Sequence, residues 1–215
     1  MKKRKRNSLG QFAKNSKSEI SLVNLSSYTT PIMKEQPNKD WVKFGEDNDY
    51  FQYILDRYNG SATNHAAVNG IAQQIFGKGL NALNANKKPD QYAKMVSLFK
   101  KDCVRKIAYD FYLFGQAAIQ VVYSKDRKTV ATAEHFPVET LRSEKANDKG
   151  DVEAYYYFKD WSKIKPNEEP KRIAAFGTSK EAIEILYIKP YKAGLYYYST
   201  PSWNGCIQYC ELEEE

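Results

Sequence analysis

Histidine and cysteine are the side chains that most often bind metals or act as nucleophiles, and this chain has two of the first and three of the second. Cys103, Cys206 and Cys210 form no paired framework, which is typical of a reducing compartment. Cys206 and Cys210 are four residues apart and could share a helix face. A metal site needs more ligands, and His65 and His135 lie far away in the sequence. We therefore expect no metal site and interpret the thiols as small buried apolar groups.

Catalytic motifs are also missing from the sequence. FGKGL has glycines and a lysine at the wrong spacing for a phosphate loop, and no G-x-S-x-G, H-E-x-x-H or paired C-x-x-C pattern occurs. His65 follows Asn64 at an expected helix start, where capping or surface exposure is its expected role. His135 precedes Phe136 and Pro137 and could orient a turn. We predict that the chain is not an enzyme, with no catalytic residue and no cofactor.

The charge of the chain is concentrated at its start. The first 18 residues contain no acid and seven cations: Lys2, Lys3, Arg4, Lys5, Arg6, Lys14 and Lys17. Subtracting these seven from the 33 basic residues leaves 26, which equals the number of acidic residues. The net charge of +7 therefore describes a basic arm on a formally neutral body.

Several interpretations of the basic arm, residues 1–18, remain open. It could contact nucleic-acid phosphates, act as a nuclear localisation signal or lie on an anionic membrane. It could also be a disordered, solubilising tail, because a charged segment with few apolar residues cannot repay the entropy of ordering. No apolar run follows it, which argues against a secretory signal. The stretch 111–123 is interrupted by Gln116 and Gln120 and is too short to span a bilayer, so we expect no membrane partner.

Hydrophobic periodicity predicts an α+β fold in which helices precede a sheet. The expected helices cover about 47–58, 63–76 and 90–114. Asp47 or Asn48 could cap the first helix and Ser61 or Thr63 the second. Glycines Gly77 and Gly115 are placed to end the second and third helices.

After residue 115 the period changes to that of strands. QAAIQVVYS, TVATAEHF, VEAYYYFKDW, RIAAFG and IEILYIKPY predict a mixed or antiparallel sheet. A C-terminal helix follows, with Pro201 in its first turn and Thr200 as its cap. Glu211, Glu213, Glu214 and Glu215 would then lie in its last turn, where the helix dipole disfavours anions. We therefore expect this helix to continue in a longer protein.

The order of these elements resembles the N-terminal region of tailed-bacteriophage portal proteins. Residues 41–80 carry Trp, FG-x-DN, an aromatic helix, a small polar turn, HAAV and I-x-G-x-G-L. FYLFGQAAIQVVY is similar to the helix-to-strand step of that family. AEHFPVETLRSEKANDKGDVEAYYYFKDW and IEILYIKPYKAGLYYYSTPSW are similar to its following segments. These segments span most of residues 41–212 in the expected order.

The resemblance implies a structural subunit of a head–tail connector. Such a subunit forms a ring, expected to be dodecameric, at one capsid vertex, where double-stranded DNA passes during packaging and ejection. It further implies terminase, capsid or scaffold, and tail-adaptor proteins as partners, and a place in the virion after assembly in the host cytoplasm. The domain organisation expected is a basic arm (1–18), an extended connector (19–40) and an α+β wing domain (41–215), truncated before the stem and clip.

Two tyrosine triplets are the candidate contacts between subunits. They are Tyr155, Tyr156 and Tyr157, and Tyr196, Tyr197 and Tyr198, because aromatic anchors dominate interface energetics. Ordinary strand surface explains the same residues equally well. The competing hypothesis is a nucleic-acid-binding module, in which the basic arm contacts phosphates and exposed tyrosines stack on bases of a single strand.

Overall fold

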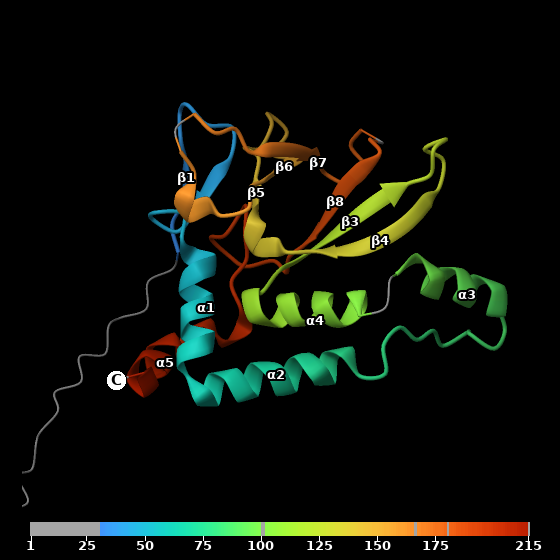
Figure 1. The fold of residues 1–215 in the computed structure, drawn as a ribbon, viewed down its shortest axis with the longest axis horizontal. Coiled ribbons are helices and arrows are strands. Elements are labelled where there is room, and N and C mark those ends of the chain that lie inside the picture. Colours follow the sequence, from blue (N-terminus) through green and yellow to red (C-terminus); the bar gives the residue numbers. More distant parts are fainter. Residues whose placement is uncertain (1–30, 100–101, 166, 180, 215) are drawn as a thin grey trace, which may run out of the picture.

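The computed structural model describes residues 31–99, 102–165, 167–179 and 181–214. The basic arm and residues 19–30 of the predicted connector lie outside the described residues. In the described part the fold is α+β, as predicted (Figure 1). Its helices are α1 (Tyr50–Gly60), α2 (Ala62–Phe76), α3 (Pro89–Leu98), α4 (Cys103–Phe114) and α5 (Ile207–Glu214). Single 3-10 turns cover Val138–Thr140, Trp161–Lys163 and Ser202–Cys206.

The strands form antiparallel sheets, which decides between the mixed and antiparallel alternatives. A two-stranded sheet pairs β1 (Met33–Glu35) with β2 (Val42–Phe44). A second sheet has the order β4-β3-β8, with β3 at Ala117–Tyr123, β4 at Val130–Phe136 and β8 at Ile183–Ile188. A third has the order β5-β6-β7, with β5 at Leu141–Ser143, β6 at Ala154–Tyr157 and β7 at Lys171–Ala174. Figure 1 shows the strands on one side of the molecule and the helices α2, α4 and α5 on the other.

An aromatic core joins the N-terminal strands and α1 to the C-terminal segment. The ring of Phe44 stacks on Tyr198 with centroids 4.3 Å apart and meets Phe51 edge-on at 5.3 Å. Phe51 in turn meets Phe114, the last residue of α4, at 5.3 Å. These rings are almost fully buried and come from residues far apart in the sequence. Their packing therefore holds residues 42–51, the end of α4 and the segment at Tyr198 together.

The helix predicted over 90–114 is wrong, because the structure divides it into α3 and α4. Phe99 has an extended backbone and forms a parallel bridge with Ala133 of β4. Its side chain packs against the cluster of Ile119, Val121 and Ala133. α4 then starts after Asp102, which is in the left-handed region at φ 68°. The tertiary contact with the sheet therefore interrupts a helical pattern that is continuous in sequence.

The predicted helix starts are confirmed in part. Asp49 precedes α1 and makes no capping bond, so the expected cap by Asp47 or Asn48 is wrong. Asn48 has φ 65° and instead accepts the backbone N–H of Phe44 through Oδ1 at 3.2 Å. For α2 the cap is Ser61, whose Oγ accepts the N–H of Asn64 at 3.0 Å.

The helix ends at Gly77 and Gly115 are confirmed, with φ of 54° and 72°. A side chain at Gly115 would overlap the backbone of Thr200, so the turn from α4 into β3 requires glycine for space as well as for φ. The expected cap by Thr200 is wrong, since Pro201 precedes the 3-10 turn and no side chain caps it. The hydroxyl of Thr200 is within hydrogen-bond distance of Lys192 Nζ.

The acidic end of α5 is stabilised by α1 and α2. Glu213 accepts the backbone N–H of Thr63 at 3.1 Å and the Thr63 hydroxyl at 2.8 Å, in the first turn of α2. Arg57 of α1 lies 3.3 Å from Glu211 and 3.0 Å from Glu214. The carboxylates that are unfavourable for their own helix dipole therefore meet the N-terminus of a second helix and an arginine.

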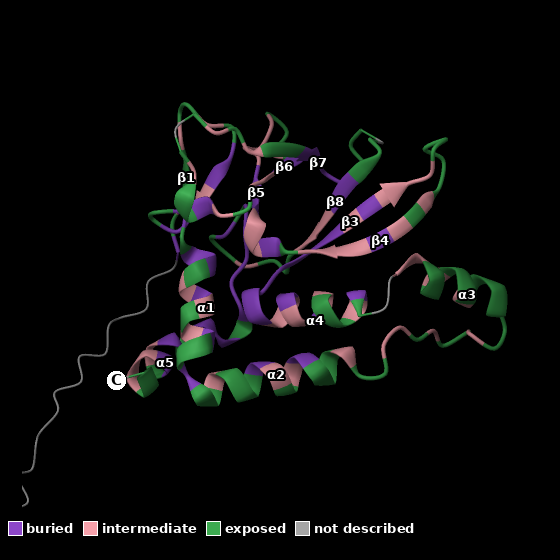
Figure 2. Ribbon diagram, viewed as in Figure 1, coloured by how far each residue is buried: buried purple, intermediate pink, exposed green. Residues whose placement is uncertain are grey.

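None of the described helices is long and apolar enough to cross a membrane. Burial follows the layers of the fold, as Figure 2 shows: the strands and the facing sides of α1 and α4 contain most of the buried residues, whereas α3 contains none.

Candidate functional site

Three of the six tyrosines in the two triplets are buried inside the chain. Tyr198 is fully buried, and Tyr155 and Tyr197 are at least nine-tenths buried. The Tyr155 ring stacks on Tyr187 with centroids 4.7 Å apart. The hydroxyl of Tyr198 donates to the Val42 carbonyl and accepts the N–H of Ser143 at 3.0 Å. These three tyrosines are used by the core of this chain, and little of their surface is left for a neighbouring subunit.

The other members of the triplets are accessible. Tyr156 and Tyr157 are half-buried, and Tyr156 donates to Glu144 at 3.3 Å. Tyr196 is 52% exposed, and Lys189 Nζ lies 5.6 Å from the centre of its ring. The predicted contact between subunits stays a prediction, and Tyr196 offers the largest free surface for it.

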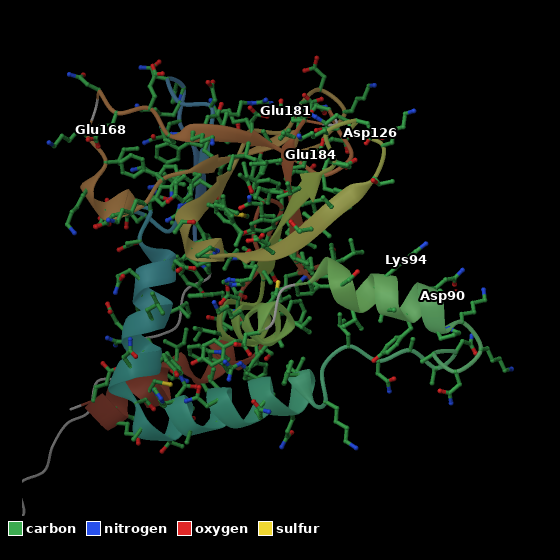
Figure 3. The ribbon with its side chains drawn as sticks, turned by 45° about the vertical axis from the view of Figure 1, so that its right-hand side comes forward. Asp90, Lys94, Asp126, Glu168, Glu181 and Glu184 are labelled. Carbon is green, nitrogen blue, oxygen red and sulfur yellow. The ribbon has the colours of Figure 1, made fainter. Side chains whose placement is uncertain are left out.

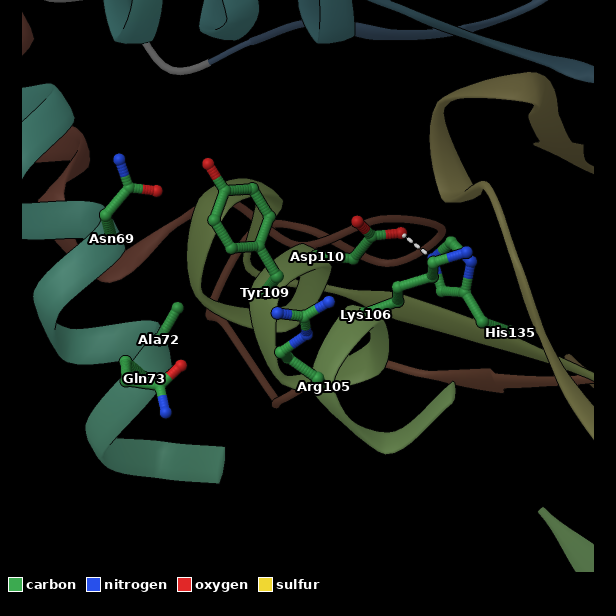
Figure 4. Close-up of a pocket in the computed structure, with 8 residues that line it drawn as sticks. All are labelled: Asn69, Ala72, Gln73, Arg105, Lys106, Tyr109, Asp110 and His135. Atoms are coloured by element: carbon green, nitrogen blue, oxygen red, sulfur yellow. Dashed lines mark hydrogen bonds and ion pairs between the residues drawn. The ribbon is translucent and has the colours of Figure 1, made fainter. Parts of the chain in front are cut away.

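A cavity of about 400 Å³ between α2 and α4 is lined largely by polar side chains (Figure 4). The α2 wall consists of Asn69, Ala72 and Gln73, and the α4 wall of Arg105, Lys106, Tyr109 and Asp110, with His135 of β4 at one end. Helical spacing of four residues in each wall aligns these side chains along the groove. The cavity therefore depends on how two helices and one strand pack.

A buried carboxylate–imidazole pair closes the inner end of this cavity. Asp110 is 9% exposed, and its Oδ2 lies 2.7 Å from Nε2 of His135. Burial raises the pKa of Asp110 above its ordinary value, and the hydrogen bond from His135 opposes that rise. The sequence predicts only a turn-orienting role for His135 and none for Asp110. The available signal was an acid on the apolar face of α4, three residues after Ile107 and three before Leu113.

The outer wall of the cavity has a polar chain that joins α1, α2 and α4. Tyr58 donates to Asn69 Oδ1 at 3.1 Å, and its hydroxyl lies 3.3 Å from Nε2 of His65. The hydroxyl of Tyr109 also bonds to that of Tyr58. Burial and this bond raise the pKa of Tyr109 well above its ordinary value. His65 is therefore a partner of Tyr58, on which its ring stacks at 4.3 Å, and does not cap α2.

The groups lining the cavity can bind and orient polar groups. Arg105, Lys106 and the two amides supply donors, and Asp110 is occupied by His135. Among the described residues, no three His, Cys, Asp or Glu side chains are grouped as metal ligands. Cys103 and Cys210 are buried as expected, whereas Cys206 is exposed and departs from that expectation.

A second buried charge, Arg142 of β5, lies between α1 and the turn that starts at Trp161. Its guanidinium donates to Asn48 Oδ1, to the Asn48 carbonyl at 2.9 Å and to the Glu139 carbonyl at 2.9 Å. It also lies 5.0 Å from the centre of the Phe51 ring and 4.9 Å from that of Trp161. Burial lowers the pKa of Arg142 to about 10. This arginine stabilises the structure through carbonyl oxygens and aromatic faces.

A third buried charge, Glu184, fixes the loop before β8 (Figure 3). Its carboxylate accepts the backbone N–H groups of Gly177 at 2.9 Å and Glu181 at 3.3 Å, and the hydroxyl of Tyr123 at 3.0 Å. This arrangement satisfies a buried anion with donors from a turn, so it serves the loop conformation.

The likeness of this chain to known proteins is one of structure. No protein-family model matches the sequence, and no curated protein matches it. A solved chain from the neck of an empty GTA particle, computed with C6 symmetry, shares the fold with a TM-score of 0.55. The sequences are 11% identical, and the match covers 85% of this chain and 44% of that one. The present chain thus spans less than half the length of its structural neighbour.

Proposed function

We propose that this chain is a structural subunit of a portal ring at the head–tail vertex of a tailed bacteriophage or a related particle. The observation that carries the proposal is the shared fold with a chain from a particle neck, which covers 85% of the present chain. In this proposal the described residues form the outer wing of the subunit. The ring, expected to be dodecameric, surrounds the channel through which double-stranded DNA enters and leaves the capsid.

The order of elements supports the same assignment. The segments that resemble portal proteins correspond to α1 with α2, to the step from α4 through Gly115 into β3, and to β8 with the following tyrosine-rich loop. The step at Gly115 is packed against Thr200, so two of the resembling segments meet in space. A sequence resemblance made of separate aromatic and glycine positions thereby gains a common structural basis.

In this role the chain acts by packing and not by catalysis. Terminase, capsid or scaffold proteins and tail adaptors would be its partners, first in the host cytoplasm and then in the virion. The pair of Asp110 and His135 and the buried Arg142 would hold the helices against the sheets under load, because each links elements that are distant in sequence.

The competing nucleic-acid-binding module needs exposed tyrosines for base stacking. Tyr155, Tyr197 and Tyr198 are buried, so only Tyr156, Tyr157 and Tyr196 of the two triplets could contribute. The cations of that hypothesis, Lys2 to Lys17, lie outside the described residues.

Imaging of the assembled protein tests the proposal. The product of the complete reading frame that contains this chain would be purified and examined by negative-stain electron microscopy and mass photometry. We expect rings with a central channel and a mass that corresponds to a fixed number of subunits. Monomers at micromolar concentration, together with salt-sensitive binding of single-stranded DNA that depends on residues 2–17, would replace the portal assignment by the binding module.

A further inference from the structure

Residues 77–99, here called the α3 arm, extend from one end of the helical layer. Figure 1 shows α3 and the preceding loop beyond the ends of α2 and α4. None of the ten residues of α3, all of which the structure describes, is buried. Leu83 has a relative exposure of 105% and Val96 one of 43%. These exposed apolar side chains, on an extension that buries none of its own helix, leave apolar surface that a second copy could cover.

The α3 arm is basic and its charges are free in solvent. Lys78, Lys87, Lys88 and Lys94 are exposed, and Asp90 is the one acid between residues 77 and 99. Figure 3 shows Asp90 and Lys94 at the end of the molecule that is remote from α5. The four cations and one anion leave an excess of three positive charges.

The opposite end of the molecule has the complementary charge. There α1 and α5 pack together, and Glu211 and Glu214 of α5 lie beside Arg57 of α1. These three residues, with Asp56 of α1 and Glu213 of α5, are here called the acidic end. Its four anions and one cation leave an excess of three negative charges. Asp56 and Glu213 are exposed, the side chain of Glu214 is 22% exposed in its pair with Arg57, and Tyr209 of α5 is 61% exposed. This end therefore offers negative charge and an accessible aromatic ring.

The two surfaces lie at opposite ends of the longest axis of the molecule (Figure 1). Two antiparallel copies could make both contacts at once around a two-fold axis, whereas copies that each use the arm on one side and the acidic end on the other make a heterologous contact. Such a heterologous contact repeats from copy to copy and closes into a ring when the rotation between copies allows it. The placement of the charges thus corresponds to the type of interface that a ring requires.

We propose that the α3 arm of one copy docks on the acidic end of the next copy; this inference rests on the proposed ring. Lysines of the arm lie against Asp56, Glu213 and Glu214, while Leu83 and Val96 cover Tyr209. The opposite charges accelerate association and fix which ends meet. Burial of the apolar residues and the tyrosine stabilises the contact once it has formed.

Reciprocal charge reversal tests this contact in the complete protein. The variant K87E/K88E places acids on the arm, and D56K/E214K places cations on the acidic end. We expect each variant alone to raise the subunit concentration needed for half-maximal ring formation about tenfold or more, because like charges then face each other. The combination of all four substitutions restores opposite charges, and we expect it to recover most of the lost assembly.

A matched control is K125E/K128E, which reverses two exposed lysines in the turn between β3 and β4. It changes the net charge by the same amount as K87E/K88E and should leave ring formation unchanged. Circular dichroism of each variant monitors folding, and rescue by the fourfold variant excludes misfolding as the cause.

The outcomes separate this inference from the proposed function. If the wild-type protein forms rings and K87E/K88E forms them equally well, the contact is wrong and the portal assignment stands. The contact is also wrong if circular dichroism shows the fourfold variant to be folded and it stays as defective as D56K/E214K. If the wild-type protein forms no ring, the proposed function itself fails.

Discussion

Asp110 and Arg142 are both buried charges, but the fold compensates them by different means. Asp110 has a histidine partner, whereas Arg142 donates to an amide and to backbone carbonyls and lies between two aromatic rings. Burying a charge lowers the stability of the folded state unless its hydrogen bonds are made. Removing the bonds of either residue is therefore expected to lower the free energy of unfolding.

Replacing His135 with alanine leaves Asp110 buried without its 2.7 Å partner. We expect a loss of about 3 kcal/mol in the free energy of unfolding at pH 7. Burial raises the pKa of Asp110 in the folded state, so its protonated form is favoured by folding. The stabilisation by protonated Asp110 is fully present below the pKa of aspartate in the unfolded chain. It is lost as the pH rises through the raised pKa of the folded state. The defect of H135A should therefore be smaller at pH 4 than at pH 7.

Urea denaturation at both pH values measures this difference. His65→Ala is the matched control, because His65 is exposed in α2 and contacts the hydroxyl of Tyr58. We expect it to lose well under half as much stability as H135A. An equal defect of H135A at pH 4 and pH 7 would show that Asp110 is not the cause.

Replacing Arg142 with methionine keeps a side chain of similar length but removes every donor. The Asn48 amide oxygen and the carbonyls of Asn48 and Glu139 would then lose bonds inside the protein. We expect a loss of about 3 kcal/mol, since buried acceptors without partners each cost roughly 1–3 kcal/mol. Arg172→Met is the control, because Arg172 pairs with Glu144 near the surface and such pairs contribute about 1 kcal/mol or less. Similar losses for both variants in urea denaturation would refute this account of Arg142.

Among the elements, the junctions between helices and strands are the most tightly constrained. At Gly115 the chain leaves α4, enters β3 and contacts the backbone of Thr200, so three parts of the fold meet at one glycine. Gly177 has a similar positive φ of 88° but no atom near the position of a side chain.

Substituting alanine at these two glycines separates backbone strain from close packing. Gly177→Ala should lose about 1 kcal/mol, the usual cost of a left-handed conformation for an L-residue. Gly115→Ala adds an overlap with Thr200 and should lose at least about 3 kcal/mol more than Gly177→Ala, or fail to fold. Denaturant titration of both variants gives the comparison. Equal losses would mean that the junction shifts freely and does not hold α4 against the segment before α5.

For the whole molecule, the charge distribution separates the basic arm from the body. Deleting residues 2–17 removes all seven cations that the sequence places before residue 19. We expect the melting temperature to stay within about 1 °C, because a charged segment with few apolar residues contributes little to a core. If the chain binds DNA through this arm, the salt dependence of binding should decrease with the deletion. A large fall in melting temperature would instead show that the arm packs on the folded body.

The sequence by itself determined the order of α1, α2 and the later strands β3, β4, β6, β7 and β8, and the helix ends at Gly77 and Gly115, but it did not predict β1 and β2 before the helices. These features depend on local spacing, caps and turns, which neighbouring residues encode. The helical spacing of apolar residues continues through Phe99, so the sequence does not predict the break there. The break depends on the bridge from Phe99 to Ala133, which joins residues 34 positions apart in the sequence.

Only the tertiary structure decided which polar and aromatic residues meet. It paired Asp110 with His135, placed Arg142 on Asn48, and brought Glu213 to the start of α2. It also buried three of the six tyrosines in the two triplets and separated the basic α3 arm from the acidic end at α1 and α5. The physical reason is that burial and ion pairing depend on the packing of distant segments, which no local pattern specifies.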